Sequence, residues 1–205
     1  EPGPLTNTHA DGDRVGAALQ RVGFRVARIR DATSTQISAA VDAHAARLLQ
    51  AGPNAAGFFY YSGHGASDGT VNYVIPVGKP ISRAADLKES GVALDYVIAT
   101  IAAAKAGPQF VVFDACRNQL DKSVGSLKGF RPQAQVAGML IAFATADGQT
   151  AKDNGAYSAA VAAELSGTEE AIRVFQKIGR RVQVANGQLP MLQDNRTADF
   201  YFNAQ

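Results

Sequence analysis

The chain has one cysteine among its 205 residues and little net charge. A single thiol, that of Cys116, excludes an internal disulfide and any metal site built from several cysteines. Twenty Lys and Arg residues against 18 Asp and Glu residues give a formal charge of +2, with the basic residues scattered. A nucleic-acid or membrane surface is therefore not indicated.

Long apolar runs and low-complexity tracts are also missing. No stretch approaches the ~18 consecutive apolar residues of a membrane span, and residues 1–4 lack the basic and apolar parts of a signal peptide. Because this start need not be the natural one, the sequence indicates no compartment. Apolar types make up 46% of the chain and charged types 19%, which is enough for a real core. We expect one domain over residues 1–205.

Helical and extended patterns alternate along the chain. Apolar residues at helical spacing predict helices over 11–22, 37–48, 94–101, 157–165 and 172–182. Apolar runs or period-two alternation predict strands over 24–29, 57–61, 71–77, 109–113, 139–144 and 200–202. This order predicts an open, mostly parallel α/β sheet flanked by helices on both faces.

His64 and Cys116 each follow an apolar strand of the predicted sheet. His64 lies between Gly63 and Gly65, and Cys116 comes 52 positions later. The carboxyl ends of parallel strands meet at one edge of a sheet, where such folds bind their ligands. The sequence therefore predicts that the imidazole and the thiol share one site.

A cysteine and a histidine together can carry out acyl transfer. A histidine can take the thiol proton, and the thiolate can then attack a carbonyl carbon. The main-chain amides of Gly65 and Cys116 are candidates for an oxyanion hole, in which each donor is worth about 3–4 kcal/mol. His64 would protonate the leaving amine and later activate water.

A structural role is the alternative for each of these residue types. A free cysteine is usually a small buried hydrophobe, and a lone histidine is usually a packing or surface residue. We accept that interpretation for His9, in a polar segment, and for His44, which shares a helix face with apolar residues. For Cys116 the glycine-flanked His64 on a neighbouring strand end favours the functional interpretation.

Two motifs resemble a known family. They are Tyr60-Tyr61-Ser62-Gly63-His64-Gly65 and Asp114-Ala115-Cys116-Arg117. Together they resemble the caspase-like clan of cysteine peptidases, in particular the bacterial metacaspase and paracaspase relatives (orthocaspases), and weaker similarity extends along nearly the whole chain. The resemblance implies a caspase-like fold and endopeptidase activity through a thioester. In this family an apolar strand precedes the Pro4-Leu5 segment, so we expect that first strand to be missing from this chain.

The resemblance also bears on the residue recognised at P1, the substrate position before the scissile bond. Asp-cleaving caspases have a glutamine two positions before the nucleophile, where this chain has Asp114. Asp11, by its distance to Phe24, matches a second acid in the pocket of the relatives; its alternative role is to complement a helix dipole. A pocket with two carboxylates favours an Arg or Lys side chain at P1, and Arg most of all. The pocket that holds the P1 side chain is called S1, and the sequence assigns no residue to its third wall.

Further expectations concern processing and partners. Lys122, Lys128 and Arg131 lie in a polar segment, 117–135, that we expect to be a flexible loop open to self-cleavage. No cofactor is predicted: some relatives need calcium, but there is no EF-hand-like spacing, and Asp68, Asp147 and Asp153 are only scattered candidates. The partners implied are protein or peptide substrates with Arg or Lys. The sequence leaves open a monomer or a homodimer.

Two rival functions also remain open. One is a catalytically silent caspase-like module that binds a basic segment without cutting it. The other is a different Cys-His amidase or acyl transferase built on the same pair of residues.

Overall fold

The computed structural model describes residues 5–81, 83–117, 135–145 and 153–203, with only the main chain at 116 and 117. The helices are α1 (Thr8–Arg21), α2 (Ser34–Ala51), α3 (Ala84–Ser90), α4 (Leu94–Ala103), α5 (Ala156–Glu164) and α6 (Ala171–Asn186). The strands are β1 (Gly57–Ser67), β2 (Asn72–Val74), β3 (Val92–Ala93), β4 (Gln109–Arg117), β5 (Met139–Phe143) and β6 (Met191–Asp194). Within these ranges no helix is long and apolar enough to cross a membrane.

The strands form one sheet in the order β3-β2-β1-β4-β5-β6. β1 and β4 are parallel from the pair Gly57 and Gln109 to the pair Gly65 and Arg117. β4 and β5 are also parallel, whereas β2, β3 and β6 join the sheet in antiparallel fashion. The predicted open α/β sheet is thus confirmed, with the correction that the sheet is mixed and that parallel pairing is confined to its three central strands.

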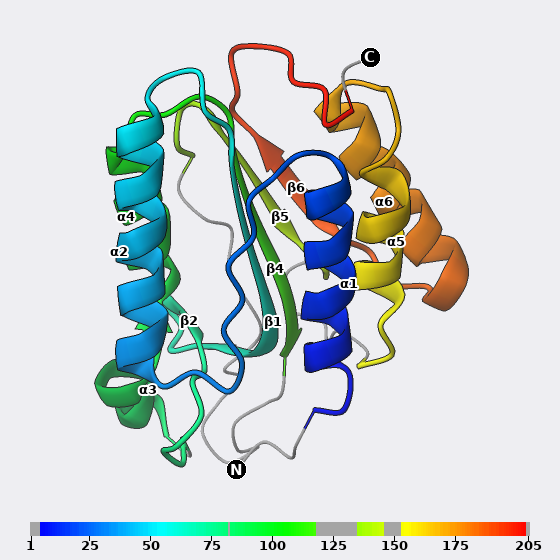
Figure 1. Cartoon of the computed structure of the whole chain (residues 1–205). Helices are drawn as coiled ribbons and strands as arrows, with labels where there is room; N and C mark the ends of the chain where they lie inside the picture. Colours follow the sequence, from blue (N-terminus) through cyan, green and yellow to red (C-terminus); the bar gives the residue numbers. More distant parts are fainter. Residues whose placement is uncertain (1–4, 82, 118–134, 146–152, 204–205) are drawn as a thin grey trace.

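Helices cover both faces of the sheet (Figure 1). Alternate residues of β4 point to opposite sides: Phe110 and Val112 pack with α1, α5 and α6, while Val111 and Phe113 pack with α2 and α4. All four are essentially excluded from solvent. A central strand buried on both faces reads as a continuous apolar run, which is why its position could be predicted from the sequence.

An aromatic cluster closes the face under α1, α5 and α6. The Phe110 ring lies 4.7 Å from that of Phe202, 5.2 Å from Phe200 and 6.0 Å from Phe175. The strand predicted at 200–202 is wrong, since this segment makes a single β-bridge, Glu170 with Tyr201. Phe200 and Phe202 instead insert their rings into the core.

The strand predicted at 24–29 is also wrong. The segment 22–33 runs beside β1 (Figure 1), but it belongs to no ladder. Residues 57–62 of β1 pair with β4 on one side, and on the other side a groove lies between them and this segment. Among the described residues no strand occupies that side of residues 57–62. Without a neighbour, the alternating pattern at 24–29 has no hydrogen-bonding partner to make it a strand.

Candidate active site

The ends of β1 and β4 bring the two predicted catalytic positions to one level of the sheet. The register pairs Ser62 with Asp114, Gly63 with Ala115 and His64 with Cys116. Neighbouring strands lie about 4.8 Å apart, so the two main-chain positions are adjacent although 52 residues separate them in the sequence. The Cys116 side chain lies outside the described part of the chain, and the Cys-His dyad therefore remains a prediction.

Local packing explains the glycine before His64. A Cβ atom at Gly63 would overlap the hydroxyl group of Tyr61. That hydroxyl lies 2.9 Å from the carbonyl oxygen of His64 and 3.0 Å from that of Ile75. The amide of Ile75 donates a hydrogen bond of 2.9 Å to the same His64 carbonyl. The main chain of His64 is thus fixed between β4 and the chain leaving β2. The structure also buries Gly65, which with Cys116 is a predicted residue of the oxyanion hole.

A small pocket lies beside these strand ends, and three aspartates contribute to its wall. Asp11 and Asp114 were both predicted, and the structure brings them together with Asp153. From the sequence Asp153 was only a scattered calcium candidate, because nothing in its local sequence indicates a pocket. The other lining residues are Leu5, Thr8, Ser62, Gly63, Gly155, Ala156 and Tyr157.

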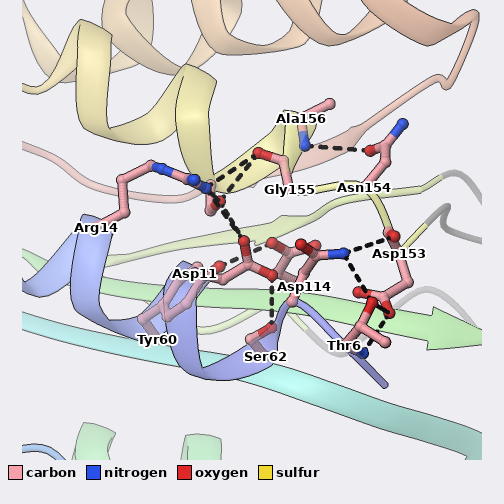
Figure 2. A network of polar contacts seen from close by, with 12 residues as sticks. Thr6, Asp11, Arg14, Tyr60, Ser62, Asp114, Asp153, Asn154, Gly155 and Ala156 are labelled. Atoms are coloured by element: carbon pink, nitrogen blue, oxygen red, sulfur yellow. Dashed lines mark hydrogen bonds and ion pairs between the residues drawn. The ribbon is translucent and has the colours of Figure 1, made fainter. Parts of the chain in front are cut away.

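Asp11 is buried in the first turn of α1, where it is only 4% exposed. Its Oδ1 accepts a hydrogen bond of 2.6 Å from the Ser158 hydroxyl and lies 3.3 Å from Nη1 of Arg14. Its Oδ2 lies 3.3 Å from the hydroxyl of Ser62 on β1 (Figure 2). Complementing the helix dipole would need no burial, so these contacts exceed what that alternative role requires.

Asp114 has different surroundings. Its Oδ2 accepts a hydrogen bond of 2.7 Å from the Tyr60 hydroxyl. Burial raises the pKa of Asp114 from its usual 3.8 to about 7; the Tyr60 hydrogen bond opposes this shift, and the charges of Asp11 and Asp153 add to it. Burial, followed by the charge of Asp114, also raises the pKa of Tyr60.

Asp153 is held by the residues that precede α1. Its Oδ2 accepts hydrogen bonds from the Thr6 amide at 2.7 Å and from the Thr6 hydroxyl at 3.2 Å. Its main-chain carbonyl accepts a bond of 2.8 Å from the Asn7 side chain. Figure 2 shows these contacts beside those of Asp11 and Asp114. The pocket wall is therefore assembled from segments that lie far apart in the sequence.

The remaining candidate residues lie elsewhere or outside the described residues. His9 pairs with Asp31 at 2.8 Å on the surface, and burial lowers the pKa of His44 on α2. Asp68 accepts two main-chain hydrogen bonds in a turn, from Thr70 and Val71. Self-cleavage after the predicted basic residues stays a prediction. Those residues, together with one calcium candidate, lie outside the described ranges: Lys122, Lys128, Arg131 and Asp147.

Comparison with known families identifies the class of protein. A family model described as "Caspase domain" matches residues 2–201, so the chain belongs to the caspase domain family. Its members are cysteine-type peptidases that act on proteins. The predicted family resemblance is confirmed at this level. No curated protein matches.

Solved structures agree on the fold. The chain is similar to a structure titled "Crystal Structure of Caspase-1 from Spodoptera frugiperda", with 18% identity and a TM-score of 0.69, over 99% of this chain and 84% of that one. It is also similar to "structure of pro-sf-caspase-1", with 16% identity and a TM-score of 0.67, over 98% of this chain and 84% of that one. At these identities the likeness shows the caspase-like fold alone.

Proposed function

We propose that this chain is a cysteine endopeptidase of the metacaspase and paracaspase type that cleaves after Arg or Lys. The observation that carries the proposal is the pocket lined by Asp11 and Asp114 beside the strand ends of His64 and Cys116. A pocket of this charge next to a nucleophile suits a basic P1 side chain.

The chemistry follows from the two strand-end residues. The Cys116 thiolate attacks the scissile carbonyl, the carbon–nitrogen bond breaks, and His64 gives a proton to the leaving amine. Water activated by His64 then hydrolyses the thioester. The amides of Gly65 and Cys116 are the proposed donors to the oxyanion formed in both steps.

The polar groups of the pocket favour a cation over an anion. An acidic P1 side chain would meet Asp11 and Asp114 and lose its hydration without gaining a partner. A guanidinium can bond two carboxylates at once through its planar fork, whereas an ammonium offers a single point of charge. We therefore expect Arg to be preferred over Lys, and both to be strongly preferred over Asp.

A silent binding module is the main alternative. On the side that faces the segment 22–33, residues 57–62 of β1 have no strand partner in the described part of the chain, and an incomplete sheet can leave Asp11 less firmly placed. Such a protein would bind basic peptides without cutting them.

The test uses fluorogenic peptides that differ only at P1, with Arg, Lys, Asp or the uncharged arginine analogue citrulline. We expect kcat/KM for Arg to exceed that for citrulline by roughly 10²-fold, because a charged hydrogen-bonded pair contributes about 1.5–3 kcal/mol. Asp114→Ala should remove this preference and Cys116→Ala should remove activity.

The matched control is Asp199→Ala, at an exposed aspartate, which should behave as the wild type. A preference for Asp at P1 would contradict the proposed specificity. Tight binding of Arg peptides without cleavage would instead establish the silent module.

A further inference from the structure

Of the three carboxylates of the pocket, Asp11 alone has a charged side-chain partner among the described residues. That partner is Arg14, whose guanidinium contacts Asp11, Ser158 and the Gly155 carbonyl. Asp114, by contrast, has as its hydrogen-bond donor the neutral hydroxyl of Tyr60. The positive charge is therefore placed at Asp11, and the carboxyl of Asp114 faces the negative charges.

A carboxyl in that position is unfavourable as an anion. It has lost water on burial, and the negative charges of Asp11 and Asp153 repel its ionised form. Two states relieve this: the carboxyl holds a proton, or a cation enters the pocket. With a pKa of about 7, the Asp114 carboxyl of the empty pocket is in the first state below neutral pH and is divided between its two forms near pH 7.

We propose that the pocket exchanges a proton for the cation of the substrate: Asp114 carries the proton while the pocket is empty and releases it when a guanidinium or ammonium group enters. The role of the substrate cation rests on the proposed function. The O–H bond of the carboxylic acid breaks, the proton passes to buffer, and hydrogen bonds from the incoming cation take its place. No electrons are transferred.

Titratable and charged side chains on every element around Asp114 affect how readily it exchanges its proton. β1 contributes Tyr60 and, two residues beyond Ser62, His64; α1 contributes Asp11 and Arg14. Tyr157 of α5 and Asp153 complete the pocket wall. Because His64 also serves catalysis in the proposed function, binding has to be measured apart from turnover. Cys116→Ala provides the protein for that measurement.

The exchange makes affinity for a basic group depend on pH in a defined direction. Below about pH 7 a cation must displace a proton, so its dissociation constant should fall about tenfold for each pH unit of increase. Above about pH 8 the carboxyl is already ionised and the dissociation constant should level off. A protease with this pocket would recognise basic substrates poorly in mild acid and well at neutral pH.

The experiment is titration calorimetry of Cys116→Ala with agmatine, which carries the guanidinium of arginine. Measurement at each pH in two buffers of different ionisation enthalpy gives the number of protons released. We expect close to one proton at about pH 6 and almost none at about pH 9. With Asp114→Asn added, release should vanish, whereas the exposed control Asp199→Asn should leave it unchanged.

Asp153→Asn separates an electrostatic role from a merely structural one. Removing the charge of Asp153 lessens the repulsion on the ionised Asp114 and so lowers its pKa. The bend in the plot of the dissociation constant against pH, where the constant levels off, should therefore move to lower pH. Loss of fold alone would weaken binding at every pH without moving the bend.

The outcomes distinguish this inference from the proposed function. Agmatine bound without proton release from about pH 6 to 9, with preference for Arg at P1 retained, would overturn the exchange and leave the specificity standing. No binding of agmatine at any pH would overturn both.

Discussion

At the level of a single residue, Asp114 links the proposed recognition of a basic group to the stability of the empty protein. In the unfolded chain its carboxyl ionises near 3.8, and in the fold at about 7. The folded state therefore holds the proton more firmly, and the stability that depends on it is present at low pH and is lost as pH rises through 7. Such a cost is typical of a group placed for function rather than for stability.

Replacing this carboxyl by an amide tests that cost. We expect Asp114→Asn to be more stable than the wild type, and its advantage to be larger at about pH 8 than at about pH 5 by roughly 2 kcal/mol, because the amide cannot ionise. Urea unfolding of both proteins at the two pH values measures the difference. An advantage independent of pH would show that burial does not perturb the carboxyl of Asp114.

The residues that could be predicted from the sequence are those with a local signature. Gly63, His64 and Gly65 follow one apolar run, and Asp114 and Cys116 end another, so short patterns indicated them. Asp153 has no such signature. It reaches the pocket only because the chain that leads into α5 passes the residues before α1, where Thr6 holds it.

Among the elements, α2 begins with side-chain hydrogen bonds that cap its first turn. Thr33 and Gln36 form a capping box, in which the Thr33 side chain accepts from the Gln36 amide and the Gln36 side chain accepts from the Thr33 amide. α2 packs Ile37, Val41 and Leu48 into the core beneath it. The cap therefore supports one of the two helices, α2 and α4, on that face of the sheet.

Removal of the cap should be measurable. Thr33→Ala leaves the main-chain amide of Gln36 without its acceptor, and we expect it to lower the free energy of unfolding by about 1 kcal/mol. Thr35→Ala, at an exposed position in the first turn of the same helix, should leave stability unchanged or slightly higher, since alanine favours helix. Equal losses in both variants on thermal or urea unfolding would contradict the role of the cap.

Strands could be predicted where the burial of both faces leaves a run of apolar residues in the sequence. They could not be predicted where a partner strand decides whether a segment is a strand. β4 and β5 were recognisable because both faces of each strand are covered. The segment 24–29 alternates like a strand but has no ladder, and β6 is a strand only because β5 offers it an antiparallel partner. Local sequence reports side-chain burial, whereas a partner strand is a property of the tertiary structure.

For the molecule as a whole, residues 57–62 of β1 are an interior part of the sheet with a strand on one side only among the described residues. Alternate amides in 57–62 point to β4, and the others point to the groove beside the segment 22–33. We expect hydrogen exchange measured by NMR to alternate along these residues, fast for the groove side and slow for the β4 side. Amides of residues 109–113 of β4, which have a strand on each side, should all exchange slowly. Uniform protection of 57–62 would mean that another chain covers this edge.

The contact between Thr6 and Asp153 joins positions 147 residues apart. Closing so long a loop is entropically costly and repays little until the strands between are in place, so contacts of this kind form late on a folding pathway. A refolding chain should regain its helical signal before it can discriminate arginine from citrulline. Peptidase selectivity would then report the last event of maturation, and a partly folded chain would be unable to choose among the proteins around it.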